Sequence, residues 1–294
     1  MSMSSRDPVG AQFGIEGMRR FRTGSASASG VRLPDSARAG LQETGVPVQV
    51  PPYFTAAGES DALQLGTFAA HAGLPRPAAG FEGWPRVGHD GLAQLCVRPD
   101  GALQAVMLEG GEQDLFVSSD LEAFNASLAV LDRVLPVIAT SAGLAEAAGG
   151  FRELNDALRG IDGEAFVERE GWWPRVLDDV RHTLNFPFSA AFEYVDGAGE
   201  KHIVTEATGP GRPHPEELVW RELSSRGVAP GQVRRVYCEL QACMMPGHYC
   251  AVWMQRLFPQ AEFTHAYDYD SDAESREAGL KALIMRAAEQ AGHG

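Results

Sequence analysis

Hydrophobic and polar residues alternate along residues 84–117 in a pattern typical of β-strands. The alternating runs are "WPRVGHDGLAQLCVRP", "ALQAVML" and "DLFVS", and they are separated by "DG" and "EGGEQ". Asp-Gly or Gly-Gly between alternating runs is a hairpin signal. The pattern then changes to helical spacing in "SSDLEAFNASLAVLDRVL". Its apolar residues share one face: Leu121, Phe124, Leu128 and Leu131. Residues 84–135 are therefore predicted to form an antiparallel sheet with a helix packed on it.

The segments on either side of this sheet differ in regularity. Residues 1–30 are rich in Ser, Gly and Ala and have no steady hydrophobic period, so we predict an N-terminal segment that is at least partly mobile. Residues 33–45 have helical spacing that ends at Gly45, and "VQVPPYFTA" after them is predicted to be extended. Residues 151–184 contain at least two more helices, and a domain boundary is predicted near Asn185.

The C-terminal half follows a different order of elements. A hairpin over residues 189–209 precedes a helix. This helix is predicted to begin at His214, because Pro215 suits the first helical turn and Gly227 suits the helix end. A strand, a second helix from Cys250, a further strand and a last helix follow. The predicted order is β-β-α-β-α-β-α.

Composition and charge limit the classes of protein that this chain can belong to. Its 294 residues are 44% hydrophobic and 22% charged, which is typical of a soluble protein with two domains. No stretch approaches the roughly 18 apolar residues of a membrane span, and the N-terminus lacks the apolar core of a signal peptide. We therefore expect a cytoplasmic protein without membrane contact. A net formal charge of −14 opposes broad electrostatic attraction to nucleic acid.

The cysteines point to specific chemistry because three of the four fall between residues 238 and 250. In a reducing compartment such a cluster indicates metal binding or catalysis more often than disulfides. The predicted topology brings His214, Cys243 and Cys250 to the same edge of the sheet. One nitrogen and two sulfurs suit zinc, and three protein ligands leave the fourth tetrahedral position open, as in catalytic sites. Glu216 would then work beside the metal as an acid.

The N-terminal half resembles the SUKH superfamily, in its actinobacterial immunity-protein branch. The resemblance rests on "LPDSARAGLQETGVP" with "PPYF", on "VGHDGLAQLCVRPDGALQAV", on "FVSSDLEAFNASL" and on "IDGEAFVEREGWWPRVLDDV", over residues 15–184. It implies an α+β binding scaffold without catalysis that docks onto a toxin and neutralises it. The alternative is that these runs form some other α+β domain, with Cys96 as a small buried residue.

Residues 185–294 resemble the zinc-dependent nucleotide and nucleic-acid deaminases, in particular the deaminase domains of bacterial polymorphic toxins. Their signature is H-x-E followed by P-C-x-x-C. Carried over to "HPE" and the two cysteines, it implies His214, Cys243 and Cys250 as zinc ligands, Glu216 as general acid/base, and a three-layer α/β cytidine-deaminase-like fold. The chain departs from the signature, because "MMPGHY" separates the cysteines and Ala242 stands where proline is usual.

Other residues near this predicted site keep alternatives open. His248 is an alternative ligand, a loop residue, or part of the substrate entrance. Trp220 and Tyr249 are candidates for stacking on a base, although aromatic residues beside helices are more often in the core. Cys238 is interpreted as a strand residue, because a fourth protein ligand would close the site and make it structural.

The leading hypothesis is a zinc-dependent deaminase fused to an immunity-type domain. Zinc-bound hydroxide would attack C4 of cytosine and Glu216 would shuttle protons, giving uracil and ammonia. The substrate would be single- or double-stranded DNA, RNA, or a free nucleotide, and the SUKH-like half would bind a cognate toxin or its own deaminase neighbour. The alternative is a non-catalytic immunity or interaction protein with a degenerate deaminase half.

Overall fold

The computed structural model of the chain describes residues 8–22, 33–58, 63–109, 114–185, 187–269 and 272–292. The chain divides into two compact units. The first unit consists of Met1–Val137 and Gly150–Val176, and the second of Ile138–Gly149 and Leu177–Gly294. Helix α6 (Trp172–Asn185) thus contributes residues to both units, and it ends at the position where the sequence pattern places the domain boundary.

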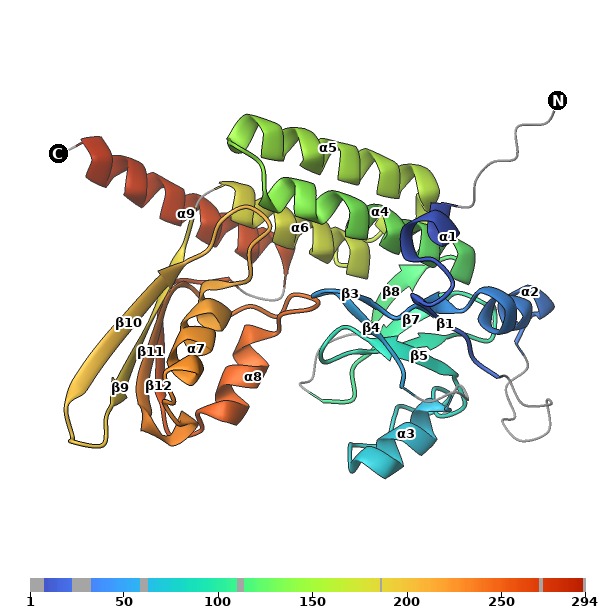
Figure 1. Cartoon of the computed structure of the whole chain (residues 1–294), viewed down its shortest axis with the longest axis horizontal. Helices are drawn as coiled ribbons and strands as arrows, with labels where there is room; N and C mark the ends of the chain where they lie inside the picture. Colours follow the sequence, from blue (N-terminus) through green and yellow to red (C-terminus); the bar gives the residue numbers. More distant parts are fainter. Residues whose placement is uncertain are drawn as a thin grey trace. The chain divides into compact units, whose positions relative to one another are not determined.

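A six-stranded antiparallel sheet forms the centre of the first unit, in the order β3-β4-β5-β6-β7-β8 (Figure 1). Its strands are β3 (Gln49–Val50), β4 (Phe54–Ala56), β5 (Arg86–His89), β6 (Gln94–Val97), β7 (Leu103–Val106) and β8 (Leu115–Ser118). A separate two-stranded sheet pairs β1 (Met18–Arg19) with β2 (Val46–Pro47). The predicted hairpins around residues 84–117 are confirmed, and Cys96 lies fully buried in β6.

Helix α4 packs on this sheet through the apolar face that the sequence pattern predicts. The helical segments are α1 (Pro8–Phe13), α2 (Asp35–Ala39), η1 (Gly40–Thr44), α3 (Leu65–Ala72), α4 (Leu121–Ala139), α5 (Leu144–Ile161) and η2 (Glu164–Phe166). Phe124 of α4 packs edge-to-face on Phe54 of β4, with ring centroids 5.3 Å apart. Asp162, directly after α5, accepts hydrogen bonds from the hydroxyls of Ser118 and Ser119, and so joins this helix to the end of β8.

The predicted mobile segment, residues 1–30, is only partly described. Helix α1 and strand β1 occupy residues 8–13 and 18–19, and Phe21 beside them is buried. Residues 1–7 and 23–30 lie outside the described part of the chain, so the predicted mobility of that part stays a prediction.

The second unit contains a four-stranded mixed sheet in the order β10-β9-β11-β12. Its elements follow the predicted β-β-α-β-α-β-α order: β9 (Ser189–Val195), β10 (Lys201–Ala207), α7 (Pro215–Ser225), η3 (Pro230–Gln232), β11 (Val233–Leu240), α8 (Cys250–Leu257), β12 (Glu262–Tyr267) and α9 (Ala273–Gly292). Strands β9 and β10 form the antiparallel hairpin, whereas β11 and β12 run parallel because α8 connects them. Both units are therefore mixtures of helices and sheet.

One hydrophobic core holds the second unit together. Phe192 of β9, Val219 of α7 and Phe258 after α8 are fully buried in it, and the rings of Phe192 and Phe258 pack edge-to-face. Helices α7 and α8 lie near each other beside the sheet (Figure 1), and this packing fixes where their N-terminal ends lie. Among the described residues, no helix combines the length and apolar character that crossing a membrane requires.

Candidate metal centre

A histidine caps the N-terminal end of α7. His214 is the N-cap residue in an extended conformation, and Pro215 follows at the first helical position, where a missing N–H costs nothing. Glu217 accepts a hydrogen bond from the backbone N–H of His214 at 2.9 Å. Glu216 and Glu217 also interact favourably with the positive end of the helix dipole. The sequence "HPEE" thus begins the helix and leaves the His214 ring buried.

The segment between β11 and α8 brings two cysteines to the same place. It turns back on itself at Gly247 (φ 82°) and Tyr249 (φ 45°), so that the N–H of Ala251 reaches the carbonyl oxygen of Cys243 at 3.2 Å. Cys250 is then the first residue of α8. The six residues "MMPGHY" therefore form a folded excursion that still leaves both sulfurs adjacent.

His214, Cys243 and Cys250 form a buried trio whose donor atoms converge. His214 Nδ1 lies 3.3 Å from Cys243 Sγ and 3.6 Å from Cys250 Sγ. Ligands of a tetrahedral zinc with Zn–S and Zn–N bonds of about 2.3 and 2.0 Å stand roughly 3.5 Å apart. The three side chains thus fit zinc in donor type and in spacing, and their donor atoms all lie within 4.8 Å of one another.

Electrostatics favour a thiolate within this trio. Burial opposes ionisation of Cys243, but a hydrogen bond with Cys250 and the positive charge of His214 hold the pKa of the Cys243 thiol well below its usual value. Burial alone would lower the pKa of His214, but the Cys243 thiolate and the Asp179 carboxylate raise it well above its ordinary value. A buried anion and cation therefore stabilise each other, and the thiolate is the form of cysteine that binds metal.

Glu216 is a buried carboxylate with one oxygen free of hydrogen bonds. Its Oε2 has no hydrogen-bond partner among the described residues, which is rare for a buried charged group. Burial raises the pKa of Glu216 above its ordinary value, although the charge of His214 opposes this shift. A cavity of about 10 Å³ borders Glu216, His214 and Cys243, which is room for roughly one water molecule. The Glu216 carboxylate thus borders a space of about one water molecule, which His214 and Cys243 also line.

Comparison with protein families assigns both parts of the chain. Residues 5–179 match the family model of the SUKH-4 immunity proteins, which covers more than half of the chain. The chain belongs to the SUKH-4 immunity protein family. Residues 187–286 of this SUKH-4 protein match a second family model, described as Xanthomonas-like deaminase. Neither a curated protein nor a solved structure matched the chain. The predicted fusion of a SUKH immunity domain with a deaminase domain is therefore confirmed.

The deaminase domain of the SUKH-4 protein contains every residue of the predicted site, but it does not bring all of them to the cavity. His214, Glu216 and Cys243 line the cavity, and Cys250 completes the trio. Cys238 lies outside the trio and shares a hydrogen bond with Glu216. Cys238 thus lies close to the carboxylate without belonging to the trio.

The three residues predicted to contact substrate lie elsewhere. Trp220 packs on Phe258, with ring centroids 4.9 Å apart, and Tyr249 is buried at the start of α8. His248 is also buried, with its ring stacked on His214 at a centroid distance of 3.9 Å. None of these three side chains lines the cavity beside Glu216, so their contact with a substrate stays a prediction.

Helix α6 contributes residues that the sequence analysis missed. Asp179 Oδ1 lies 2.8 Å from His214 Nε2, and His182 Nδ1 lies 2.5 Å from the hydroxyl of Tyr269. Asp179 is the last residue of the SUKH-4 match but belongs to the second compact unit. Nothing in the hydrophobic pattern of α6 connects it with a site 35 residues further along the chain, so no sequence signal was available.

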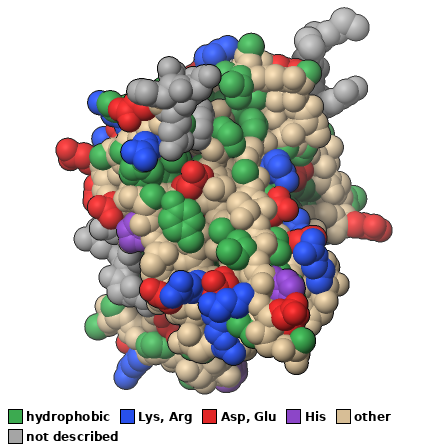
Figure 2. Space-filling view, turned by 90° about the vertical axis from the view of Figure 1, so that its left-hand side faces the viewer, with side chains coloured by type: hydrophobic (Ala, Val, Ile, Leu, Met, Phe, Trp, Pro, Cys, Tyr) green, Lys and Arg blue, Asp and Glu red, His purple; other side chains and the backbone are tan. Residues whose placement is uncertain are grey.

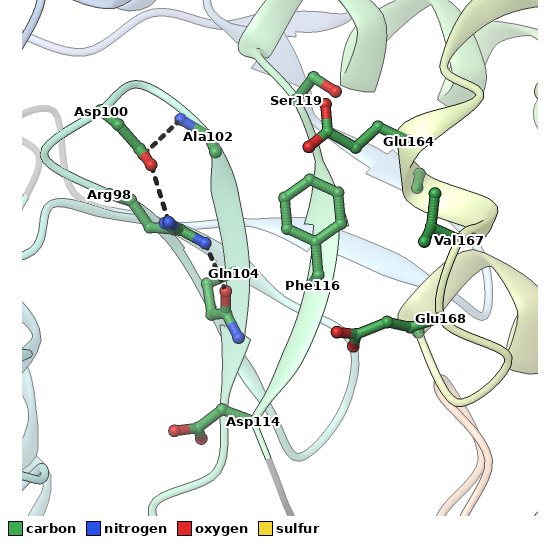
Figure 3. A pocket seen from close by; sticks show the side chains of 12 residues that line it. Arg98, Asp100, Ala102, Gln104, Asp114, Phe116, Ser119, Glu164, Val167 and Glu168 are labelled. Carbon is green, nitrogen blue, oxygen red and sulfur yellow. Dashed lines mark hydrogen bonds and ion pairs between the residues drawn. The ribbon is translucent and has the colours of Figure 1, made fainter.

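The SUKH-4 domain has an open cleft of about 420 Å³ on its sheet. Figure 3 shows Phe116 of β8 between the strands and the segment that carries Glu164, Val167 and Glu168. Arg98, on the other side of the cleft, is already paired with Asp100 at 2.7 Å. Acidic groups with an exposed apolar residue, Val167, thus dominate this cleft.

Proposed function

We propose that the deaminase domain of this SUKH-4 protein is a zinc-dependent enzyme that converts cytosine to uracil. The proposal rests on the buried trio of His214, Cys243 and Cys250 beside the unpartnered Oε2 of Glu216. The family match makes deamination the reaction to expect of this domain. We also propose the three-layer cytidine-deaminase fold for it, since α7 and α8 present their N-terminal ends to the same site.

The residues of the site have distinct tasks in this reaction. His214, Cys243 and Cys250 would hold the zinc, which when bound lowers the pKa of a water molecule and makes it a nucleophile near neutral pH. Glu216 Oε2 would accept a proton from that water and deliver it to the amino group that leaves C4 as ammonia. A raised pKa suits this task, because a group that both takes and gives a proton works best with a pKa near the ambient pH.

The substrate would be a cytosine in DNA, in RNA, or in a free nucleotide. The net charge of −14 disfavours broad binding to a phosphate backbone. Figure 2 shows one face of the protein, on which Lys and Arg side chains are interspersed with Asp and Glu side chains. Recognition would therefore depend on contacts near the base. A reducing compartment such as the cytoplasm suits the site, because Cys243 and Cys250 bind metal only as reduced sulfur.

The decisive experiment compares the full-length protein with its Glu216→Gln variant. Both are loaded with zinc, and uracil formation is measured on single-stranded DNA, duplex DNA, RNA and cytidine nucleotides. We expect one zinc per chain in both proteins, conversion in the wild type, and conversion about 100- to 10,000-fold slower in the variant. Full activity of a folded Glu216→Gln variant would overturn the proposed role of Glu216.

A second candidate function is a non-catalytic binding protein, and the small cavity favours it. A space of about 10 Å³ cannot admit a cytosine without movement of the surrounding residues. The SUKH-4 domain would then dock onto a partner such as a toxin, and the acidic cleft around Glu164 and Glu168 would suit a basic segment of that partner. Bound zinc without turnover of any cytosine substrate, together with binding to a cognate toxin, would support this function over the enzyme.

A further inference from the structure

A closed circuit of hydrogen bonds surrounds His214. Its ring Nε2 lies 2.8 Å from Asp179 Oδ1, and Asp179 Oδ2 lies 3.2 Å from His248 Nε2. His248 Nδ1 lies 3.0 Å from Glu217 Oε2. The same oxygen of Glu217 accepts the backbone N–H of His214 at 2.9 Å. The circuit therefore starts at the ring of His214 and returns to its backbone.

The contact with Asp179 determines which ring nitrogen of His214 carries hydrogen. Asp179 is buried, and its carboxylate lies between Nε2 of His214 and Nε2 of His248. A carboxylate that contacts two ring nitrogens accepts hydrogen bonds from them, so His214 Nε2 is the donor. The other nitrogen, Nδ1, then offers its lone pair towards the sulfurs of Cys243 and Cys250 when the ring is neutral.

We propose that Asp179 is a positioning residue for the metal centre, which rests on the zinc site proposed above. The carboxylate fixes the orientation of the His214 ring and keeps a hydrogen on Nε2, so that Nδ1 is the nitrogen that binds the ion once it has released its own hydrogen. Carboxylates behind a metal-binding histidine act in this way in general, and their loss typically weakens metal binding about 10- to 100-fold. Here the carboxylate comes from α6, outside the residues that match the deaminase family.

The unusual spacing of the cysteines contributes to the same arrangement. The excursion "MMPGHY" supplies His248, whose ring stacks on His214 with an interplanar angle of 4° and bridges Asp179 to Glu217. The extra residues between Cys243 and Cys250 thus place a second side chain, His248, against the ring of His214. His248 lies outside the trio and supports His214 through Asp179, Glu217 and the stacked ring, so its loss should weaken metal binding less than the loss of Asp179.

The test measures metal affinity in full-length Asp179→Asn, a variant that keeps the shape of the side chain and removes its charge. Zinc affinity is measured by competition with a chromophoric chelator, and the absorption bands of bound Co²⁺ report the ligand geometry. We expect about 10- to 100-fold weaker zinc binding and shifted Co²⁺ bands. Thermal unfolding of the metal-free proteins separates these effects from a loss of folding.

The matched control is Asp178→Asn, on the same helix. Asp178 pairs with Arg181 at 2.8 Å and with Arg276 at 3.3 Å instead of the histidines, so this variant makes the same change of charge without touching His214. It should bind zinc as the wild type does. Equal zinc affinity and equal Co²⁺ spectra in wild type and Asp179→Asn would overturn the positioning role while leaving the zinc site intact. Absence of zinc from the folded wild type would instead overturn the proposed metal centre.

Discussion

At the residue scale, the four buried cysteines have different tasks. Cys243 and Cys250 converge on His214, whereas Cys238 lies beside Glu216 and Cys96 lies in the other unit. Burial raises the pKa of the Cys238 thiol far above its usual value, and the negative charge of Glu216 adds to this. A thiol that stays protonated is a poor metal ligand. The arrangement is therefore the one expected of the proposed site with three protein ligands, and not of a closed structural site with four.

Cysteine-to-serine substitutions test this distinction. Cys250→Ser should lose zinc, because it removes one of three ligands, and Cys238→Ser should keep one zinc per chain. The measurement is the metal content of the folded variants by elemental analysis, with Cys96→Ser as a control for the loss of a buried sulfur. Loss of zinc together with unfolding of the deaminase domain in Cys238→Ser would show that the site is structural and has four ligands.

The lowered pKa of the buried His182 side chain should make the free energy of unfolding depend on pH. Burial lowers its pKa to about 4, from 6.5 for the exposed side chain. Between these two values the unfolded chain binds more protons than the folded one, so stability decreases as the pH falls from about 6.5 to about 4. The contribution of His182 over this range is on the order of 3 kcal/mol, at about 1.4 kcal/mol per unit of pKa.

The matching experiment compares wild type with His182→Gln. The free energy of unfolding is measured by denaturant titration from pH 4.5 to 7.5. The variant loses the titrating group and keeps a polar side chain that can reach the hydroxyl of Tyr269, so its stability should depend less on pH. Parallel curves for the two proteins would show that His182 is not the group responsible.

At the element scale, the packing of α9 depends on Gly279. A Cβ atom added at Gly279 would lie 1.9 Å from the carbonyl oxygen of Asp268, which follows β12, so the helix and this backbone approach more closely than any other residue allows. Nearby, Leu280 and Leu283 of α9 belong to the core of the second unit. The packing of the last helix therefore requires glycine at this position.

Gly279→Ala should destabilise the deaminase domain by about 1–3 kcal/mol, because the helix must shift away from the carbonyl oxygen. Gly231→Ala is the control, since no atom lies within 4 Å of its added Cβ, and it should leave stability nearly unchanged. Thermal unfolding of the two variants provides the comparison. Equal melting temperatures would mean that α9 can move at little cost.

At the scale of the whole molecule, the family boundaries and the compact units do not coincide. The SUKH-4 match ends at residue 179 and the deaminase match begins at residue 187, but the second compact unit already includes α6 from Leu177. Trp172, at the start of α6, donates a hydrogen bond to Asp90 in the first unit, whereas Asp179 contacts His214. Helix α6 thus contributes residues to both units, as α4 and α5 also do.

Much of this protein could be predicted from its sequence by itself. Alternating and helical hydrophobic spacing predicted the sheet of the first unit, the order of elements in the second, and the start of α7 at His214, because these features depend on residues that are close in the chain. The spacing of His214, Glu216, Cys243 and Cys250 identified the candidate site, and the combined motifs identified both families.

Only the tertiary structure decided which side chains surround that site. Asp179 and His214 are 35 residues apart, and their 2.8 Å contact depends on the tertiary packing that brings α6 to the start of α7. The same packing buries His248 between two carboxylates, a position that its loop gave no reason to expect. Hydrophobic periodicity indicates which face of an element is buried, but it does not indicate which neighbour lies against that face. For this reason the contacts of Asp179 and His248 with His214 could not be predicted.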